Sequence, residues 1–217
     1  MNVSTGSQTS AATWVGLIIA LFGILIVRIA VHHFYPEFSF TATLLNEALV
    51  WSCAIALLLV IQRGEHLSLR SIHIGTASIG SSIIWAMLLA VLLGLVGGVV
   101  AALTHFHGGR MGEAFAKLPL WLVIMVVIRA GVVEECFYRG YAIERLQQLG
   151  LNRFWAAIIP LLIFGFGHGT NGWANVILAL ALGAILTIFY LWRRDLVANM
   201  IGHFLIDFAS VVLPRFF

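Results

Sequence analysis

Charged residues are scarce in this chain of 217 residues. Asp, Glu, Lys and Arg together make up 10% of the sequence, whereas hydrophobic residues make up 61%. A soluble domain has roughly 45–50% apolar residues and about 25% charged ones. This imbalance excludes an ordinary soluble domain and predicts a protein of the lipid bilayer.

Basic clusters and cysteine pairs are also missing. The formal net charge is only +3, and no run of Lys and Arg suggests a nucleic-acid partner. A small excess of these residues is ordinary for a membrane protein, whose inner loops favour them. The two cysteines, Cys53 and Cys136, lie in separate apolar segments and form no C-x-x-C pair. We expect buried free thiols and no disulfide.

The sequence consists mainly of long hydrophobic runs. Seven apolar segments can be traced, at residues 11–31, 41–62, 78–103, 118–149, 153–166, 173–192 and 196–213. A membrane-spanning helix needs about 20 such residues. The pattern predicts an all-α protein, a polytopic transmembrane helical bundle of about seven spans, with six to eight possible.

Two adjacent carboxylates and an arginine interrupt the fourth segment, at Glu134, Glu135 and Arg139. Charged side chains at membrane depth are costly, so they are rare and usually functional. On an α-helix Glu135 and Arg139 share a face and can pair, while Glu134 points about 100° away from Glu135. Glu134 is then the carboxylate free to face a cavity as a general base. The alternative is a buried ion-pair network that only holds helices together.

Two more polar islands follow in separate apolar segments. His168 stands in the glycine-rich stretch 164–169, where it could exchange protons or bind a metal. His203 and Asp207 are four residues apart and so share a helical face. Taken alone, each of these two histidines could simply be a structural residue held by a hydrogen bond. Three islands together favour one shared site.

Arg129 and Glu47 also lie within apolar segments. Arg129 is about 140° from Glu134 around an α-helix, so we expect it to face another partner, with Glu47 as the candidate. The alternative is that Arg129 receives a carboxylate or polar end group of a substrate.

The expected depths of the site residues disagree. At about 1.5 Å per residue, Glu134 lies about 24 Å from the start of its segment, while His168 and His203 lie about 22 and 12 Å from the opposite side. These depths do not coincide within a hydrocarbon core about 30 Å thick.

The order and spacing of the three motifs resemble those of the CPBP family of intramembrane proteases, also called the Abi family, which includes CAAX-processing proteases. The motifs are Glu134-Glu135-x-x-x-Arg139, Phe164-x-x-x-His168 and His203-x-x-x-Asp207. The resemblance covers about residues 118–213. We therefore divide the chain into N-terminal transmembrane helices without a recognisable motif, 1–116, and a CPBP/Abi-like catalytic helical core, 117–217.

The resemblance implies an intramembrane endopeptidase that hydrolyses a peptide bond of a membrane-associated protein or peptide. Glu134 with His168 would activate a water, His203 and residue 207 would stabilise the oxyanion, and Arg139 would hold Glu135. The family usually has asparagine at 207, and an ionised aspartate cannot donate a hydrogen bond. Either Asp207 is protonated or it only orients His203, and we favour the second.

Zinc is an open alternative for the cofactor. Glu134, His168 and His203 would make a plausible zinc set with water as the fourth ligand. The H-E-x-x-H helix of many zinc proteases is absent, so we favour a glutamate-based site without a cofactor.

The alternative function is a catalytically inactive membrane binding or immunity protein that retains the fold. The expected partners are the bilayer and a membrane-associated protein or peptide substrate, with no nucleic acid. The expected location is the cytoplasmic, or inner, membrane of a prokaryote, as a multi-pass protein. The oligomeric state stays open.

Overall fold

Helices account for every regular element in the described part of the chain, residues 11–106 and 109–216 of a computed structural model. The α-helices are α1 (Ala11–Phe34), α2 (Phe40–Leu59), α3 (Ile79–Thr104), α4 (Gly109–Ala116), α5 (Leu120–Arg129), α6 (Glu144–Gln148), α7 (Arg153–Phe166), α8 (Trp173–Arg193) and α9 (Leu196–Asp207). Short π- or 3₁₀-helical segments are η1 (Val60–Gly64), η2 (Leu69–Ile72), η4 (Gly169–Asn171), η5 (Phe208–Val212) and η6 (Leu213–Arg215). A longer π-helix, η3 (Ala130–Ile143), joins α5 to α6.

Six of the seven apolar segments form helices long and apolar enough to cross a membrane. They are Ala11–Phe34, Phe40–Gly64, Ile79–Thr104, Arg153–Asn171, Trp173–Arg193 and Leu196–Arg215. The remaining segment, α5–η3–α6, is a continuous helical rod that is not among them because charged side chains recur along it. The predicted fold class, a polytopic transmembrane helical bundle, is confirmed.

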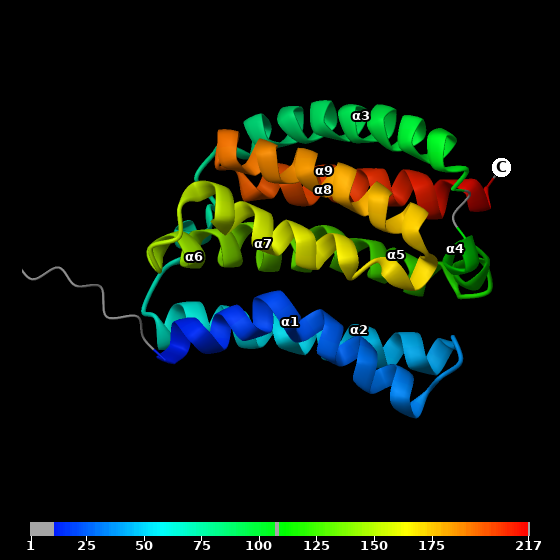
Figure 1. Cartoon of the computed structure of the whole chain (residues 1–217), viewed down its shortest axis with the longest axis horizontal. Coiled ribbons are helices and arrows are strands. Elements are labelled where there is room, and N and C mark those ends of the chain that lie inside the picture. Colours follow the sequence, from blue (N-terminus) through cyan, green and yellow to red (C-terminus); the bar gives the residue numbers. More distant parts are fainter. Residues whose placement is uncertain (1–10, 107–108, 217) are drawn as a thin grey trace, which may run out of the picture.

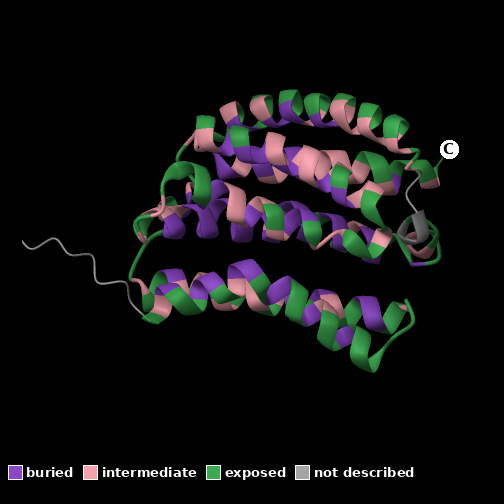
Figure 2. Ribbon diagram, in the orientation of Figure 1, coloured by how far each residue is buried: buried purple, intermediate pink, exposed green. Residues whose placement is uncertain are grey.

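The charged rod lies in the middle of the bundle. Figure 1 shows α3 at one side, α8 and α9 next to it, then α7 and the rod, and the α1–α2 pair at the opposite side. Helix η3 contacts α1, α2, α7 and α9, so elements from both ends of the sequence surround it. Every residue of η3 except Val132 is buried, and Figure 2 shows this burial along the rod.

Two glycines let α9 and its neighbours approach η3 closely. A Cβ atom at Gly131 would lie 2.8 Å from the carbonyl oxygen of Met200 and 2.9 Å from Cβ of Phe204. At Gly140 it would lie 2.7 Å from Cδ2 of Leu196. Atoms at such separations overlap, so a larger side chain would push α9 away. This close contact sets the position of the histidine on α9.

Helix α7 ends inside the bundle. Its fourteen residues, capped at the start by the Asn152 side chain, span about 21 Å, which is less than the hydrocarbon thickness of about 30 Å. Gly172, with a φ of 89°, then turns the chain into α8. In the break between α7 and α8, the carbonyls of Gly167 and His168 accept hydrogen bonds from the side chains of Arg28 and Asn175. Such irregular backbone is tolerated at membrane depth where it is buried in protein or lines a cavity.

Candidate active site

Glu135 is the centre of a buried polar cluster that ties η3 to α9. It is fully buried, and its Oε1 accepts hydrogen bonds from Nη1 of Arg139 at 2.7 Å and from Nδ1 of His203 at 2.8 Å. Its Oε2 accepts one from Nδ2 of Asn199 at 3.1 Å. The predicted pairing of Glu135 with Arg139 is confirmed, and Glu135 additionally fixes the orientation of His203.

Arg139 extends this cluster to α8 and α7. Its guanidinium donates to the carbonyl of Gly183 at 3.1 Å and to the Thr187 hydroxyl at 3.4 Å. It also stacks 4.4 Å from the centre of the Phe164 ring. Glu135 and Arg139 therefore connect four helical segments, η3, α7, α8 and α9.

Glu134 takes part in a separate ion-pair chain. Nη1 of Arg129 donates to Oε1 of Glu134 at 2.6 Å, and Nε of Arg129 lies 3.2 Å from both oxygens of Glu47. The expected Glu47–Arg129 pair is confirmed. The expectation that Arg129 faces away from Glu134 is wrong, because η3 is a π-helix. Its i→i+5 hydrogen bonding brings residues five apart onto one face, whereas an α-helix would separate them.

A cavity of about 320 Å³ joins Glu134 to His168. Its polar lining comes from Arg28, Glu134, Tyr138 and His168, and its apolar lining from Phe22, Ile24, Leu25, Leu162, Ile163, Phe164 and Phe166. Such a volume lies at the lower end of the range for ligand pockets, roughly 300–1,000 Å³. Glu134 and His168, predicted from two distant motifs, thus meet on one cavity.

His168 presents one nitrogen to this cavity. Its Nδ1 lies 2.7 Å from the carbonyl oxygen of Phe164. A carbonyl only accepts, so Nδ1 carries the proton, and Nε2 of the neutral ring is left as an acceptor. The backbone next to it is held at two points, by Arg28 on the Gly167 carbonyl at 2.6 Å and by Asn175 on the His168 carbonyl at 2.9 Å.

Phe164 separates the two predicted histidines. Its ring centre lies 4.7 Å from that of His168 and 6.2 Å from that of His203. Phe164 lines the cavity, while His203 and Asp207 are not part of that lining. The structure therefore brings Glu134 and His168 together on the cavity, while His203 and Asp207 lie outside its lining.

His203 lies between two carboxylates. Its Nδ1 faces Glu135, and its Nε2 lies 3.5 Å from Oδ2 of Asp207. The helical spacing of four predicted the contact with Asp207. The contact with Glu135 links two motifs in different segments, and no local spacing predicts it.

The zinc alternative names three ligands, Glu134, His168 and His203. Across residues 11–106 and 109–216, no group of three or more His, Cys, Asp and Glu side chains is placed so that it could hold a metal ion. Glu134, His168 and His203 are thus not a preformed ligand set. The cysteines are both free thiols, as predicted, with Cys136 buried and Cys53 partly buried.

Arg28 and Asn199 are polar residues at the site that were not predicted from the sequence. Arg28 is the only charged residue in the first apolar segment, and a charge there is itself a sign of function. Asn199 lies four residues before His203, hence on the same face of α9. Both signals could have been used from the sequence.

Comparison with protein families assigns the region that holds this site. Residues 116–209 match the family described as type II CAAX prenyl endopeptidase Rce1-like. We refer to this stretch, by its similarity, as the Rce1-like region. The resemblance to CPBP and CAAX-type proteases is therefore confirmed. No curated protein and no solved structure matched the chain.

The Rce1-like region contains all six predicted site residues, which are Glu134, Glu135, Arg139, His168, His203 and Asp207. Arg28 and Glu47, which complete the site from α1 and α2, lie outside it. The family supports a protease of the membrane. The proposed boundary between 116 and 117 stays a prediction from the sequence.

Proposed function

We propose that this chain is an intramembrane endopeptidase in which Glu134 and His168 activate a water molecule. The observation that carries the proposal is their position on one cavity beside the end of α7. Arg129 occupies Oε1 of Glu134 and keeps the carboxylate ionised. Within the described residues, Oε2 of Glu134 and Nε2 of His168 accept no hydrogen bond, so both can bind a water.

The proposed reaction follows from these acceptors. The water oxygen attacks the scissile carbonyl carbon while Glu134 takes one water proton through Oε2. The tetrahedral intermediate then collapses, and the proton passes from Glu134 to the leaving amine nitrogen. His168 holds the attacking water through Nε2. A general base of this kind contributes typically about 10²–10⁴-fold to a rate.

We assign oxyanion stabilisation to His203 in its doubly protonated form. Its Nδ1–H is held by Glu135, and Asp207 lies beside Nε2 and orients the ring. The Phe164 ring has to turn aside for Nε2 to reach the substrate. Removing a single oxyanion donor typically costs about 10²–10³-fold in rate.

The substrate in this proposal is a membrane-associated protein or peptide that enters from the bilayer. The family description names CAAX prenyl endopeptidases, and we extend only the hydrolysis of a membrane-bound chain to this protein. We propose that it works without a metal, in the cytoplasmic membrane of a prokaryote, and does not bind nucleic acid.

Two observations favour the alternative of an inactive binding or immunity protein. Arg129 already pairs with Glu134, and Phe164 covers His203, so the site as it stands is partly closed. An inactive protein would keep its function after changes to the acid–base pair.

The test compares membrane proteins in cells that carry wild type, E134Q or H168A. We expect the same uncleaved protein to accumulate with both variants. E113Q, which changes an exposed residue of α4, serves as the control and should match wild type. If no uncleaved protein accumulated with E134Q or H168A, the protease assignment would be wrong. That result would support the alternative of an inactive binding or immunity protein.

A further inference from the structure

A groove between α7 and α8 lies apart from the cavity that holds Glu134 and His168. Its volume is about 500 Å³, within the range of ligand pockets, roughly 300–1,000 Å³. Its lining includes Arg153, Ala157 and Leu161 from one face of α7, and Ala184, Thr187 and Leu191 from one face of α8. No residue lines both this groove and the cavity, so the groove is a second binding space.

The groove faces the surroundings of the bundle. In the described part of the chain only α7 and α8 line it, and Phe154 and Ile188, which belong to the lining, are exposed. Apart from Arg153 and Thr187, the lining side chains are apolar. The exposed face of a membrane-spanning bundle lies against lipid tails, which are as apolar as leucine. An acyl chain is therefore the ligand that this groove fits.

The length of the groove matches one leaflet of a bilayer. It runs along α7 from Arg153, the first residue of the helix, to Leu161, about 12 Å at 1.5 Å per residue. At its Arg153 end, Nη2 of Arg153 donates to the carbonyl of Leu191 near the end of α8. Half of a hydrocarbon core about 30 Å thick is about 15 Å. The groove therefore accommodates most of one acyl chain within a single leaflet.

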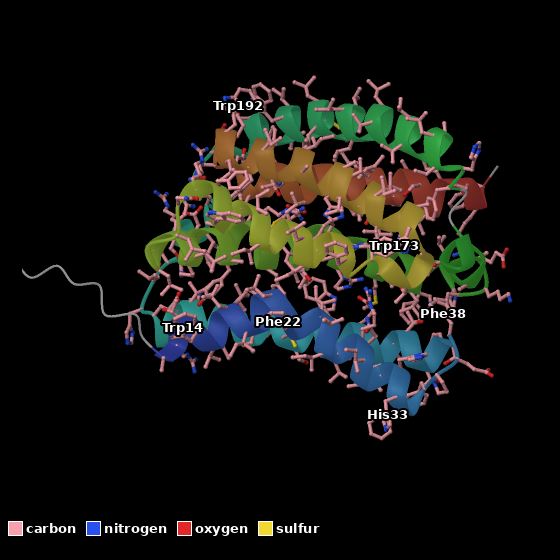
Figure 3. All side chains as sticks on the ribbon, viewed as in Figure 1. Trp14, Phe22, His33, Phe38, Trp173 and Trp192 are labelled. Carbon is pink, nitrogen blue, oxygen red and sulfur yellow. The ribbon has the colours of Figure 1, made fainter. Side chains whose placement is uncertain are left out.

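The Arg153 end of the groove lies at the level of the lipid headgroups. Trp155, two residues after Arg153, and Trp192, next to Leu191, are both exposed. Figure 3 shows Trp192 at this end of the bundle. Exposed tryptophans gather at the interface between membrane and water. Arg153 is therefore at the depth where a phospholipid carries its phosphate.

Arg153 has donors available for such a phosphate. Nearby in the chain, Arg194 pairs with Glu144, and Arg193 stacks on the ring of Trp85. Arg153 is exposed, forms no ion pair with a described residue, and donates one hydrogen bond among them. A guanidinium has five donors in a planar fork that suits a phosphate. The groove thus combines a positive charge at its mouth with an apolar bed.

We propose that this groove binds an anionic phospholipid, with the phosphate on Arg153 and one acyl chain between α7 and α8. The chain would lie against Thr187, whose hydroxyl accepts a hydrogen bond from Nε of Arg139 at 3.4 Å. Four residues earlier, the carbonyl of Gly183 accepts one from Nη2 of Arg139 at 3.1 Å. The bound lipid therefore holds in place the part of α8 that supports Arg139. This inference does not depend on the proposed function, because lipid binding requires no catalysis.

The experiment measures lipid binding to the purified full chain in detergent by native mass spectrometry. The probes are phosphatidylglycerol and phosphatidylcholine with identical acyl chains, and glycerol 3-phosphate, which has the anionic group without an acyl chain. We expect the first phosphatidylglycerol to bind about fivefold more tightly than phosphatidylcholine, the effect of one arginine on an anionic headgroup. Equal binding of the two lipids, or displacement of phosphatidylglycerol by an equal concentration of glycerol 3-phosphate, would overturn the inference.

Substitutions assign the lipid to the groove. R153Q should reduce the preference for phosphatidylglycerol to about one, and R153K should keep part of it. R70Q removes an exposed arginine of η2, on the same side of the membrane if the chain spans it seven times, and should leave the preference unchanged. A184L fills the groove with its own side chain and should weaken the binding of both lipids. An unchanged preference in R153Q, an equal loss in R70Q, or unchanged binding in A184L would contradict this assignment.

Hydrogen exchange of backbone amides tests the support of Arg139. In the wild type, phosphatidylglycerol should slow exchange in residues 183–188 of α8 more than phosphatidylcholine does, because the bound lipid opposes local opening. In R153Q the two lipids should act alike. Residues 87–92 of α3, which do not line the groove, should exchange equally with either lipid. Equal exchange of residues 183–188 with both lipids in the wild type would refute the link between the lipid and Arg139.

Discussion

At the level of single residues, Arg129 decides how Glu134 behaves. It bridges two buried carboxylates from different helices, Glu47 and Glu134. Glu134 therefore stays ionised in an apolar interior, with one oxygen fixed and the other available to a water. Glu135, its neighbour in the sequence, is fully enclosed by donors and serves the fold.

R129Q should destabilise the protein strongly. Breaking a buried pair leaves an uncompensated charge and costs about 3–5 kcal/mol, and here two carboxylates lose their partner. Thermal unfolding in detergent measures the effect, with R70Q as the exposed control. The double variant E47Q/R129Q should be more stable than R129Q, since it removes one of the two buried carboxylates that R129Q leaves unpaired. A melting temperature of R129Q equal to that of wild type would refute the ion-pair chain.

Asp207 tests how His203 is oriented. D207N should retain most of the cleavage activity, because an amide can still hydrogen-bond Nε2 of His203 or donate to an oxyanion. D207A should cleave substrate more slowly by about tenfold or more, since Nε2 of His203 then loses the side chain that orients the imidazole ring. Rates of substrate cleavage at saturating substrate distinguish the two. Equal activity of D207A and wild type would show that Asp207 has no part in the reaction.

At the level of elements, the π-helix η3 explains which side-chain contacts could be predicted from α-helical spacing and which could not. α-Helical spacing correctly paired Glu135 with Arg139 and His203 with Asp207. It failed for Arg129 and Glu134, because nothing in the local pattern signals i→i+5 bonding. Contacts between segments, such as Glu135 with His203, depend on packing that spacing alone does not encode.

G131A should disturb the contact between η3 and α9. The added Cβ would overlap the Met200 carbonyl and Phe204, and such overpacking typically costs about 1–3 kcal/mol. We expect lower thermal stability and slower cleavage, because α9 carries His203. G98A on α3 is a matched control with no atom within 4 Å of the new Cβ, and it should be neutral or slightly stabilising. Equal behaviour of the two variants would contradict the close packing of η3 on α9.

At the level of the whole molecule, the site is completed by helices outside the Rce1-like region. Glu47 on α2 anchors Arg129, and Arg28 on α1 holds the end of α7. The exposed tryptophans Trp14 and Trp192 lie toward one end of the bundle and Trp173 toward the other (Figure 3), as in the aromatic belts of membrane proteins. The sequence predicted seven segments and a contact of Glu47 with Arg129, but not that α1 would line the cavity.

Labelling of single cysteines tests the seven crossings. Seven spans place the loop after η1 and the loop after α6 on one side of the membrane, and the loop after α1 and the helix α4 on the other. S68C and Q148C should react with an impermeant maleimide from the same side of sealed vesicles. E37C and E113C should react only from the opposite side. All four positions are exposed. Reaction of Q148C from the same side as E113C would show that the charged rod does not cross.

Peptide-bond hydrolysis by Glu134 without a metal ion is the central claim for the whole molecule. Its most direct test is the cleavage rate of the purified protein on an accumulated substrate, in the presence of a strong chelator. We expect the wild-type rate to survive chelation and E134Q to be slower by at least about 10²-fold. Cleavage by E134Q at the wild-type rate, or wild-type activity lost on chelation and restored by zinc, would contradict the claim.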